Sequence, residues 1–120
     1  MNTHRAGVRF EAAAAAWLEH HGWRVLERNV RFQRREIDLI VRRGDIVAFV
    51  EVKGRRDASY GRPVEAVTAR KRMEIETVAR WWLTRHTAPG LRYRFDVVGL
   101  TEDPRGGFAL EHLEDAWRPG

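Results

Sequence analysis

The stretch from Arg35 to Lys53 constrains the fold most, because aliphatic residues recur at every second position on both sides of a turn. Before the turn these residues are Ile37, Leu39 and Val41, and after it they are Ile46, Ala48, Val50 and Val52. A period of two is typical of β-strands, whose successive side chains point to opposite faces. The stretch therefore predicts two antiparallel strands, each with one apolar face, joined at Arg43-Gly44.

Three acids, Glu36, Asp38 and Glu51, are predicted on the second face of this hairpin. If Arg43 and Gly44 form a two-residue turn, Glu36 lies opposite Glu51, Asp38 lies opposite Phe49, and Asp38 is a diagonal neighbour of Glu51. Grouped like charges destabilise a sheet unless a cation lies beside them, either Lys53 or a bound metal.

Oxygen ligands of this kind suit a hard divalent ion such as Mg²⁺ or Mn²⁺. The alternative is an ordinary surface salt bridge between Glu51 and Lys53, with the other acids solvated nearby. The apolar runs around the charges favour the metal site, because ionised groups in a strand buried on both faces seldom lack a role.

The chain length indicates one domain over residues 1–120, and 43% hydrophobic residues are enough for a modest core. The absence of cysteine excludes disulfides, thiolate zinc sites and cysteine nucleophiles, and fits a reducing compartment. The alanine run at 12–16 is too short to span a membrane and lacks the flank of a signal sequence. We therefore expect a cytoplasmic protein with no membrane partner.

An excess of 22 basic over 17 acidic residues gives a net charge of +5 and predicts a polyanionic partner, nucleic acid. The candidate contacts lie in three segments, which comprise Arg28, Arg31, Arg34 and Arg35; Arg55, Arg56, Tyr60 and Arg62; and Arg70, Lys71 and Arg72. The ring of Tyr60 in the second segment could stack on a base. The alternatives are solvated loops and an arginine-rich genome composition.

Only two of the 22 cations are lysines, Lys53 and Lys71. Arginine cannot accept a proton, whereas a lysine with a lowered pKa can, so these positions are candidates for chemistry. Lys71 also falls in the first turn of an expected helix, where the helix dipole disfavours cations, and there it could meet a phosphate or simply extend into solvent.

Further elements follow from periodicity and capping signals. Helical spacing predicts a helix at about 6–20 that ends before Gly22, with Glu11 beside its apolar stripe. Thr68 is the predicted N-cap of a helix that continues to about Arg85, and Trp81 on it is a candidate self-association contact. Strands are expected at 23–29, at 91–100 and, as a short edge strand, at 108–110.

With these residues in view, the chain resembles the PD-(D/E)XK nuclease superfamily. Asp38, twelve intervening residues and then Glu51-Val52-Lys53 match that pattern, and Glu11 matches the first-helix acid of its archaeal Holliday junction resolvase branch. More closely, about residues 7–100 resemble the small bacterial YraN-like family. The matching segments are RNVR from Arg28, EIDLI from Glu36, FVEVKGR from Phe49, TARKR from Thr68 and RFDVVGL from Arg94. The family pattern has glycine where this chain has Arg35.

The resemblance implies an α/β fold with a restriction-endonuclease-like αβββαβ core, a central mixed sheet flanked by helices. It implies that Asp38, Glu51 and Glu11 hold Mg²⁺ or Mn²⁺. It also implies that Lys53 orients or deprotonates the attacking water, and that Glu36 contacts the metal ligands but not the metal. The expected function is a Mg²⁺-dependent endonuclease for structured or branched DNA. A non-catalytic nucleic-acid-binding module and an endoribonuclease are the alternatives, and junction resolution would require a homodimer.

Overall fold

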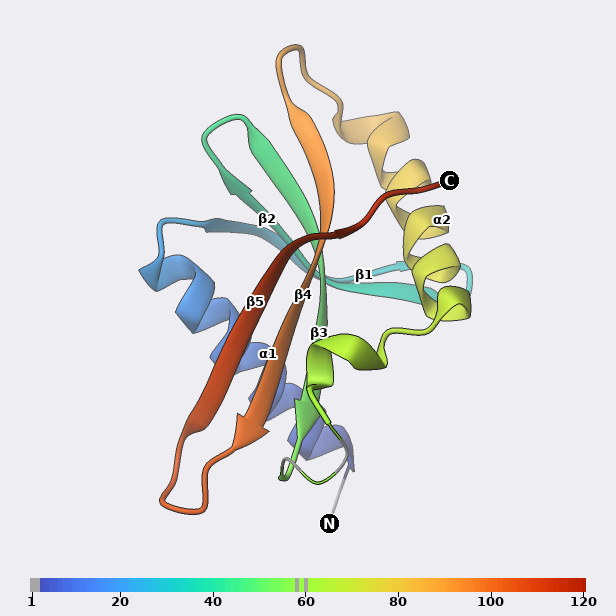
Figure 1. Ribbon diagram of the computed structural model, residues 1–120. Coiled ribbons are helices and arrows are strands. Elements are labelled where there is room, and N and C mark those ends of the chain that lie inside the picture. The colour runs from blue at the N-terminus through green and yellow to red at the C-terminus, as the bar shows by residue number, and fades with distance from the viewer. Residues whose placement is uncertain (1–2, 58, 60) are drawn as a thin grey trace.

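The computed structural model describes residues 3–57, 59 and 61–120, with side chains from residue 7 onward. It is an α/β protein in which helix α1 (Thr3–His20) and helix α2 (Ala69–His86) flank one five-stranded sheet. Figure 1 shows the two helices on opposite sides of the twisted sheet. None of the described helices is both long and apolar enough to cross a membrane.

The sheet is mixed, with its strands in sequence order from β1 to β5. All neighbouring pairs are antiparallel except β3 and β4, which are parallel and are connected through α2. A short 3₁₀ helix, η2 (Pro63–Ala66), precedes α2. The strands are β1 (Arg24–Phe32), β2 (Arg35–Arg43), β3 (Ile46–Arg55), β4 (Arg92–Glu102) and β5 (Phe108–Trp117).

Each face of the sheet buries its own apolar cluster. The cluster under α1 contains Leu18, Ala48 and Val50, and the cluster under α2 contains Phe49, Ile75 and Trp82. Consecutive residues of β3 thus pack into opposite clusters, as a strand covered on both faces requires. The predicted apolar face formed by Ile46, Ala48, Val50 and Val52 is confirmed.

Helix α1 ends and helix α2 begins where the capping signals predicted. Gly22 adopts a φ of 88°, and Trp23 N donates to Leu18 O at 3.0 Å, which closes the C-terminus of α1. At the N-terminus of α2, Thr68 Oγ1 accepts a hydrogen bond from Lys71 N at 3.1 Å. The helix α1 begins at Thr3, earlier than predicted.

The register of the central hairpin differs from the prediction. Arg43 pairs with Ile46 and Leu39 with Val50, so the turn is Gly44-Asp45 and not Arg43-Gly44. Gly44 has a φ of 61°, which suits glycine as the first residue of a two-residue turn. Glu36 is therefore not opposite Glu51, and Asp38 is not opposite Phe49.

Strand β2 also breaks the predicted alternation at Asp38. Ile37 belongs to the cluster under α2, whereas Leu39 and Val41 belong to the cluster under α1, so these three residues do not share one face. Pairing of β2 with β3 extends only as far as Leu39, while its pairing with β1 continues to Arg35. The two strands thus diverge at Asp38 and form a fork.

The C-terminal strand is longer than the predicted 108–110, because it is held by contacts that no local pattern reveals. Trp117 stacks on Phe95 with ring centroids 5.0 Å apart, and its Nε1 donates to Glu76 on α2 at 2.9 Å. Asp96, which is fully buried, accepts hydrogen bonds from Arg94 and from the Asp115 backbone, and its Oδ2 lies 2.7 Å from His112 Nε2. These interactions tie β5 to β4 and α2.

Candidate functional site

The predicted catalytic residues lie together in a cavity of about 590 Å³ at the fork between β2 and β3. Asp38 comes from β2, Glu51 and Lys53 from β3, Glu11 from α1 and Lys71 from α2, and all five line the cavity. Because β2 turns away from β3 here, residues of helices on opposite faces of the sheet reach one site. The fork therefore assembles acids and amines that are up to 60 positions apart in the chain.

Glu11, Glu36 and Asp38 form an acidic group in which one oxygen of each lies within 4.8 Å of the others. All three side chains are half-buried. Burial, followed by the charges of Asp38 and Glu36, raises the pKa of Glu11 to about 7. Arg28 acts in the opposite direction and is too weak to restore the ordinary value. The positive charge of Arg28 thus does not offset the burial of Glu11 and the charge of the other two acids.

Glu51 lies next to this group, 3% exposed. Burial, followed by a hydrogen bond and charge repulsion from Asp38, raises the pKa of Glu51 well above its usual range. Lys71 opposes this shift, with its Nζ 3.8 Å from Glu51 Oε2, and Lys53 opposes it more weakly. Asp38 is itself fixed, because its Oδ2 accepts a hydrogen bond from Val52 N at 2.8 Å.

The donor chemistry of the site fits a hard divalent cation. Four carboxylates converge in and beside one cavity, and all of the available oxygens are hard ligands. Burial, followed by repulsion between the acids, raises the pKa of Glu11 and of Glu51 despite the nearby cations. The grouping differs from the prediction in one respect. Glu36 lies among the clustered acids, whereas Glu51 approaches Asp38 from the side of α2.

Gly54 keeps the cavity wall close to α1. A Cβ atom at this position would overlap the ring of Phe10, which lies directly against the Gly54 backbone. Glycine is therefore required for β3 to pass α1 closely just beyond Lys53. Both Phe10 and Gly54 line the cavity.

Asn29 is the site residue that sequence reasoning missed. Its side-chain amide lies between Glu11 and Glu36, 2.7 Å from Oε1 of the first and 2.9 Å from Oε1 of the second. Ionised carboxylate oxygens only accept, so the amide is assigned with its nitrogen facing both acids. The available signal was an asparagine inside a strand, since asparagine tolerates the left-handed backbone that it adopts here, with a φ of 52°.

The sequence profile of Uncharacterised protein family UPF0102 matches residues 10–100. The chain belongs to this family. That assignment confirms the YraN-like resemblance seen in the sequence, and the match contains Glu11, Asn29, Asp38, Glu51, Lys53 and Lys71.

Individual UPF0102 proteins match almost the whole chain. A UPF0102 protein of Chromohalobacter salexigens is 42% identical over 116 residues, which cover 97% of this chain and 89% of the relative. One from Chloroherpeton thalassium is 42% identical and covers 98% of each chain. The Geobacter sulfurreducens relative is 41% identical over 92% of this chain and 87% of its own length.

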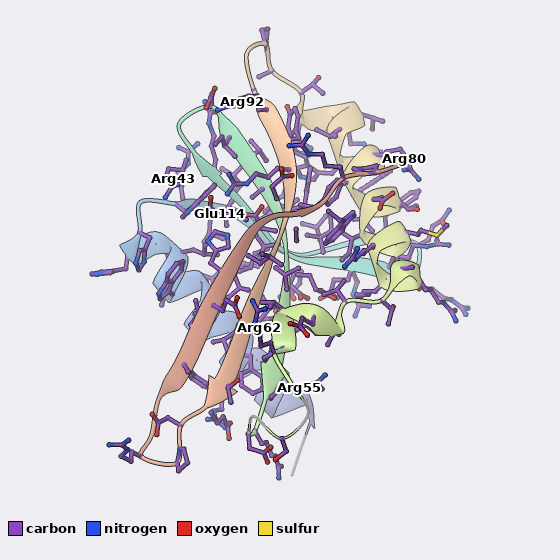
Figure 2. All side chains as sticks on the ribbon, viewed as in Figure 1. Arg43, Arg55, Arg62, Arg80, Arg92 and Glu114 are labelled. Atoms are coloured by element: carbon purple, nitrogen blue, oxygen red, sulfur yellow. The ribbon has the colours of Figure 1, made fainter. Side chains whose placement is uncertain are left out.

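In this UPF0102 protein the predicted nucleic-acid contacts have different surroundings. Arg55 and Arg56 line the acidic cavity, and Figure 2 shows Arg55 at the carboxyl end of β3 with Arg62 farther along, beside η2. Arg62 pairs with Glu65 and Glu111. Tyr60 lies outside the described residues.

The remaining predicted contacts are distributed around the fork. Arg31 donates to Glu36 at 3.0 Å, and Arg28 lies 3.9 Å from Glu19. Exposed Arg34 and half-buried Arg35 lie at and beside the β1–β2 turn. Within the first turn of α2, Arg70 pairs with Glu74 at 3.6 Å, whereas the Arg72 guanidinium lies over the Trp117 ring at 5.4 Å.

The predicted self-association contact at Trp81 has partners within the chain. Its ring stacks on Phe32 with centroids 5.0 Å apart, and Arg85 lies over it at 4.9 Å. Trp81 is half-buried and packs against the cluster under α2. Self-association at Trp81 stays a prediction.

Proposed function

We propose that this UPF0102 protein is a Mg²⁺- or Mn²⁺-dependent endonuclease that hydrolyses phosphodiester bonds of structured or branched DNA. The observation that carries the proposal is the convergence of Asp38, Glu51 and Lys53 with Glu11 in one cavity at the β2–β3 fork. Acids that hold a metal beside a compact amine are what phosphodiester hydrolysis requires. A nuclease-like fold alone would not support it, because folds host many functions.

The element order agrees with a PD-(D/E)XK relationship, which we include in the proposal. From α1 to β4 the order is αβββαβ, apart from the short η2, and the sheet is mixed and flanked by helices. The Asp and Glu-x-Lys residues lie on the two strands of the predicted hairpin. The restriction-endonuclease-like core is therefore the fold that we propose.

Asp38, Glu11 and Glu51 would hold the cation, and Glu36 would either join them or support Glu11. A bound divalent ion supplies an activated water and neutralises charge on the scissile phosphate. Asp38 suits a ligand role because its hydrogen bond from Val52 N fixes the carboxylate and uses only one of its oxygens. Burial, followed by repulsion from Asp38 and Glu36, raises the pKa of Glu11, and metal binding would relieve the repulsion.

Lys53 lines the same cavity as the acids and forms no ion pair within the described part of the chain. Its amine is available to orient the attacking water and to stabilise negative charge that develops on the phosphoryl oxygens. Lys71 is instead paired with Glu51. The two lysines of the chain thus have different surroundings within one site.

The substrate class rests on charge and on the position of the cavity. Arg55 and Arg56 line the cavity, and Arg28 is close enough to lower the pKa of Glu11, so a polyanion would meet cations on approach. Resolution of a symmetric four-way junction would need two such sites and hence a homodimer. If the protein binds nucleic acid but does not cleave it, the alternative function is a non-catalytic nucleic-acid-binding module.

The test is a cleavage assay with purified protein on duplex, flap, four-way junction and single-stranded RNA substrates, in Mg²⁺, Mn²⁺ or EDTA. We expect metal-dependent cleavage of a branched DNA that is lost in Asp38→Asn. Lys53→Arg should lower kcat by about 100-fold or more while DNA affinity stays within about twofold, because the charge remains but the compact amine is lost. DNA binding without cleavage by every variant and by the wild type would contradict the proposal.

A further inference from the structure

The side chain of Asn29 connects two acids that come from different layers of the fold. Glu11 lies on α1 and Glu36 on β2, and the Asn29 amide nitrogen donates to Oε1 of both, at 2.7 and 2.9 Å. We propose that Asn29 is a positioning residue, which fixes the Glu11 carboxylate against Asp38 so that the two can bind one divalent cation. This inference rests on the proposed function.

The hydrogen bonds form a chain that ends at Glu11. Arg31 Nε donates to Glu36 Oε2 at 3.0 Å, and Asn29 donates to the other oxygen of Glu36. Glu36 is thus held through both oxygens, whereas Glu11 receives only the Asn29 bond among the hydrogen bonds of the described residues. Asn29 therefore transmits the fixed position of Glu36 to the more weakly held Glu11.

Such a bond is needed because the acids repel one another. The nearest oxygens of Glu11, Glu36 and Asp38 lie within 4.8 Å, and a free glutamate side chain would turn away from two neighbouring carboxylates. An amide is suited to this position, since its nitrogen carries two donors and adds no charge. Groups that orient metal ligands commonly change metal affinity or activity by 10- to 100-fold when removed.

The backbone places the amide at this point. Asn29 has a φ of 52°, and the flanking pairs Arg28–Leu39 and Val30–Ile37 put it across from Asp38, where the alternation of β2 breaks. Both strands of the β1–β2 hairpin are thus irregular at the same level. The irregularity directs Asn29 toward the acids, although the residue is exposed and contributes to neither apolar cluster.

A matched pair of glycine variants separates the side chain from the backbone. Gln33 is a second residue with positive φ, 58°, in the same hairpin, and its side chain bonds to Arg35, away from the acids. Asn29→Gly and Gln33→Gly both keep a backbone that glycine adopts readily. Only Asn29→Gly removes the bond to Glu11.

The measurement is Mn²⁺ affinity by electron paramagnetic resonance, without nucleic acid, with melting in EDTA to show that each variant is folded. We expect Asn29→Gly to weaken Mn²⁺ binding by about 10- to 100-fold. Gln33→Gly should stay within about twofold of the wild type. If the wild type binds Mn²⁺ and Asn29→Gly binds it equally well, only the positioning role is overturned. If the wild type binds no Mn²⁺, the proposed function itself is overturned, and this inference with it.

Discussion

Lys71 Nζ lies 3.8 Å from Oε2 of Glu51 and connects the first turn of α2 to the acid of β3. The Glu51 side chain is 4% exposed, whereas Lys71 is 33% exposed. The first turn of a helix disfavours a cation, so the pair explains a lysine at a position that helix stability does not favour. Lys71 thus offsets part of the charge of the buried carboxylate.

At a pH at which Glu51 is ionised, we predict that Lys71→Met lowers the free energy of unfolding by about 1 kcal/mol in EDTA, a modest loss because water screens the half-exposed amine. In a Glu51→Gln background the same substitution should have little effect, since no charge remains to be offset. Urea denaturation of the four proteins in a double-mutant cycle measures this coupling. Lys53→Met is the control and should couple more weakly with Glu51. Additive effects of Lys71→Met and Glu51→Gln would show that the pair is not energetically coupled.

The pH dependence of stability should be set partly by Glu11. Its pKa rises from 4.5 to about 7 on folding, because of burial and then of Asp38 and Glu36. Between these values the folded state binds more protons than the unfolded state, so the free energy of unfolding falls as pH rises. We expect a loss of about 1 kcal/mol across this range in EDTA, after allowance for solvent screening.

The variant Glu11→Gln should flatten this slope, and equilibrium denaturation at several pH values checks it. Wild-type stability that rises between pH 5 and pH 7 in EDTA would contradict the raised pKa of Glu11.

At lower pH, Asp96 contributes to the pH dependence of stability. Burial alone would raise the pKa of Asp96, but hydrogen bonds from His112 and Arg94 lower it below 3.8. The stabilisation by ionised Asp96 is therefore lost as pH falls through this lowered pKa.

The elements of the fold were largely predictable because they depend on local patterns. The stripe of Ile75, Val78, Ala79 and Trp82 is buried on α2, as its helical spacing indicated. The register of the β2–β3 hairpin was not predictable from alternation alone. Moving the turn by one residue, from Arg43-Gly44 to Gly44-Asp45, keeps the paired residues Leu39–Arg43 and Ile46–Val50 on their predicted faces but changes each partner by two positions.

Within the site, sequence reasoning identified the charged residues and missed the neutral one. Glu11, Asp38, Glu51 and Lys53 line one cavity, which the spacing and the family resemblance anticipated. Asn29 was overlooked because its role depends on the break of alternation at Asp38, a feature of tertiary structure. Similarly, the length of β5 depends on long-range contacts such as that between Trp117 and Glu76.

The basic residues beside the cavity should make DNA binding sensitive to salt. Each lysine or arginine that contacts a phosphate releases counterions, so log affinity falls with log salt more steeply, by about 0.9 in the magnitude of the slope. We predict that Arg55→Ala and Arg56→Ala each reduce that slope by about 1, because both residues line the cavity. Fluorescence anisotropy with a short branched DNA at several salt concentrations measures it.

Arg62→Ala is the matched control for these variants. Arg62 comes from the same basic segment but pairs with Glu65 and Glu111, so it is less available to a phosphate. Its removal should change the slope by much less than 1. A slope near zero for the wild type would remove nucleic acid as the partner.

In the proposed function the carboxylates at the fork hold a divalent cation, and thermal melting tests this binding without a substrate. In EDTA, Asp38→Asn and Glu51→Gln should be as stable as the wild type or more stable, because each relieves repulsion between acids. Added Mg²⁺ or Mn²⁺ should reverse this ranking. A hundredfold excess over the dissociation constant stabilises the wild type by about 2.7 kcal/mol, and a variant that lacks a ligand should gain much less. If neither ion shifts the wild-type melting temperature at millimolar concentration, and both variants melt well below it in EDTA, the acids are structural partners of Lys53, Lys71 and nearby arginines, and the metal-dependent nuclease is contradicted.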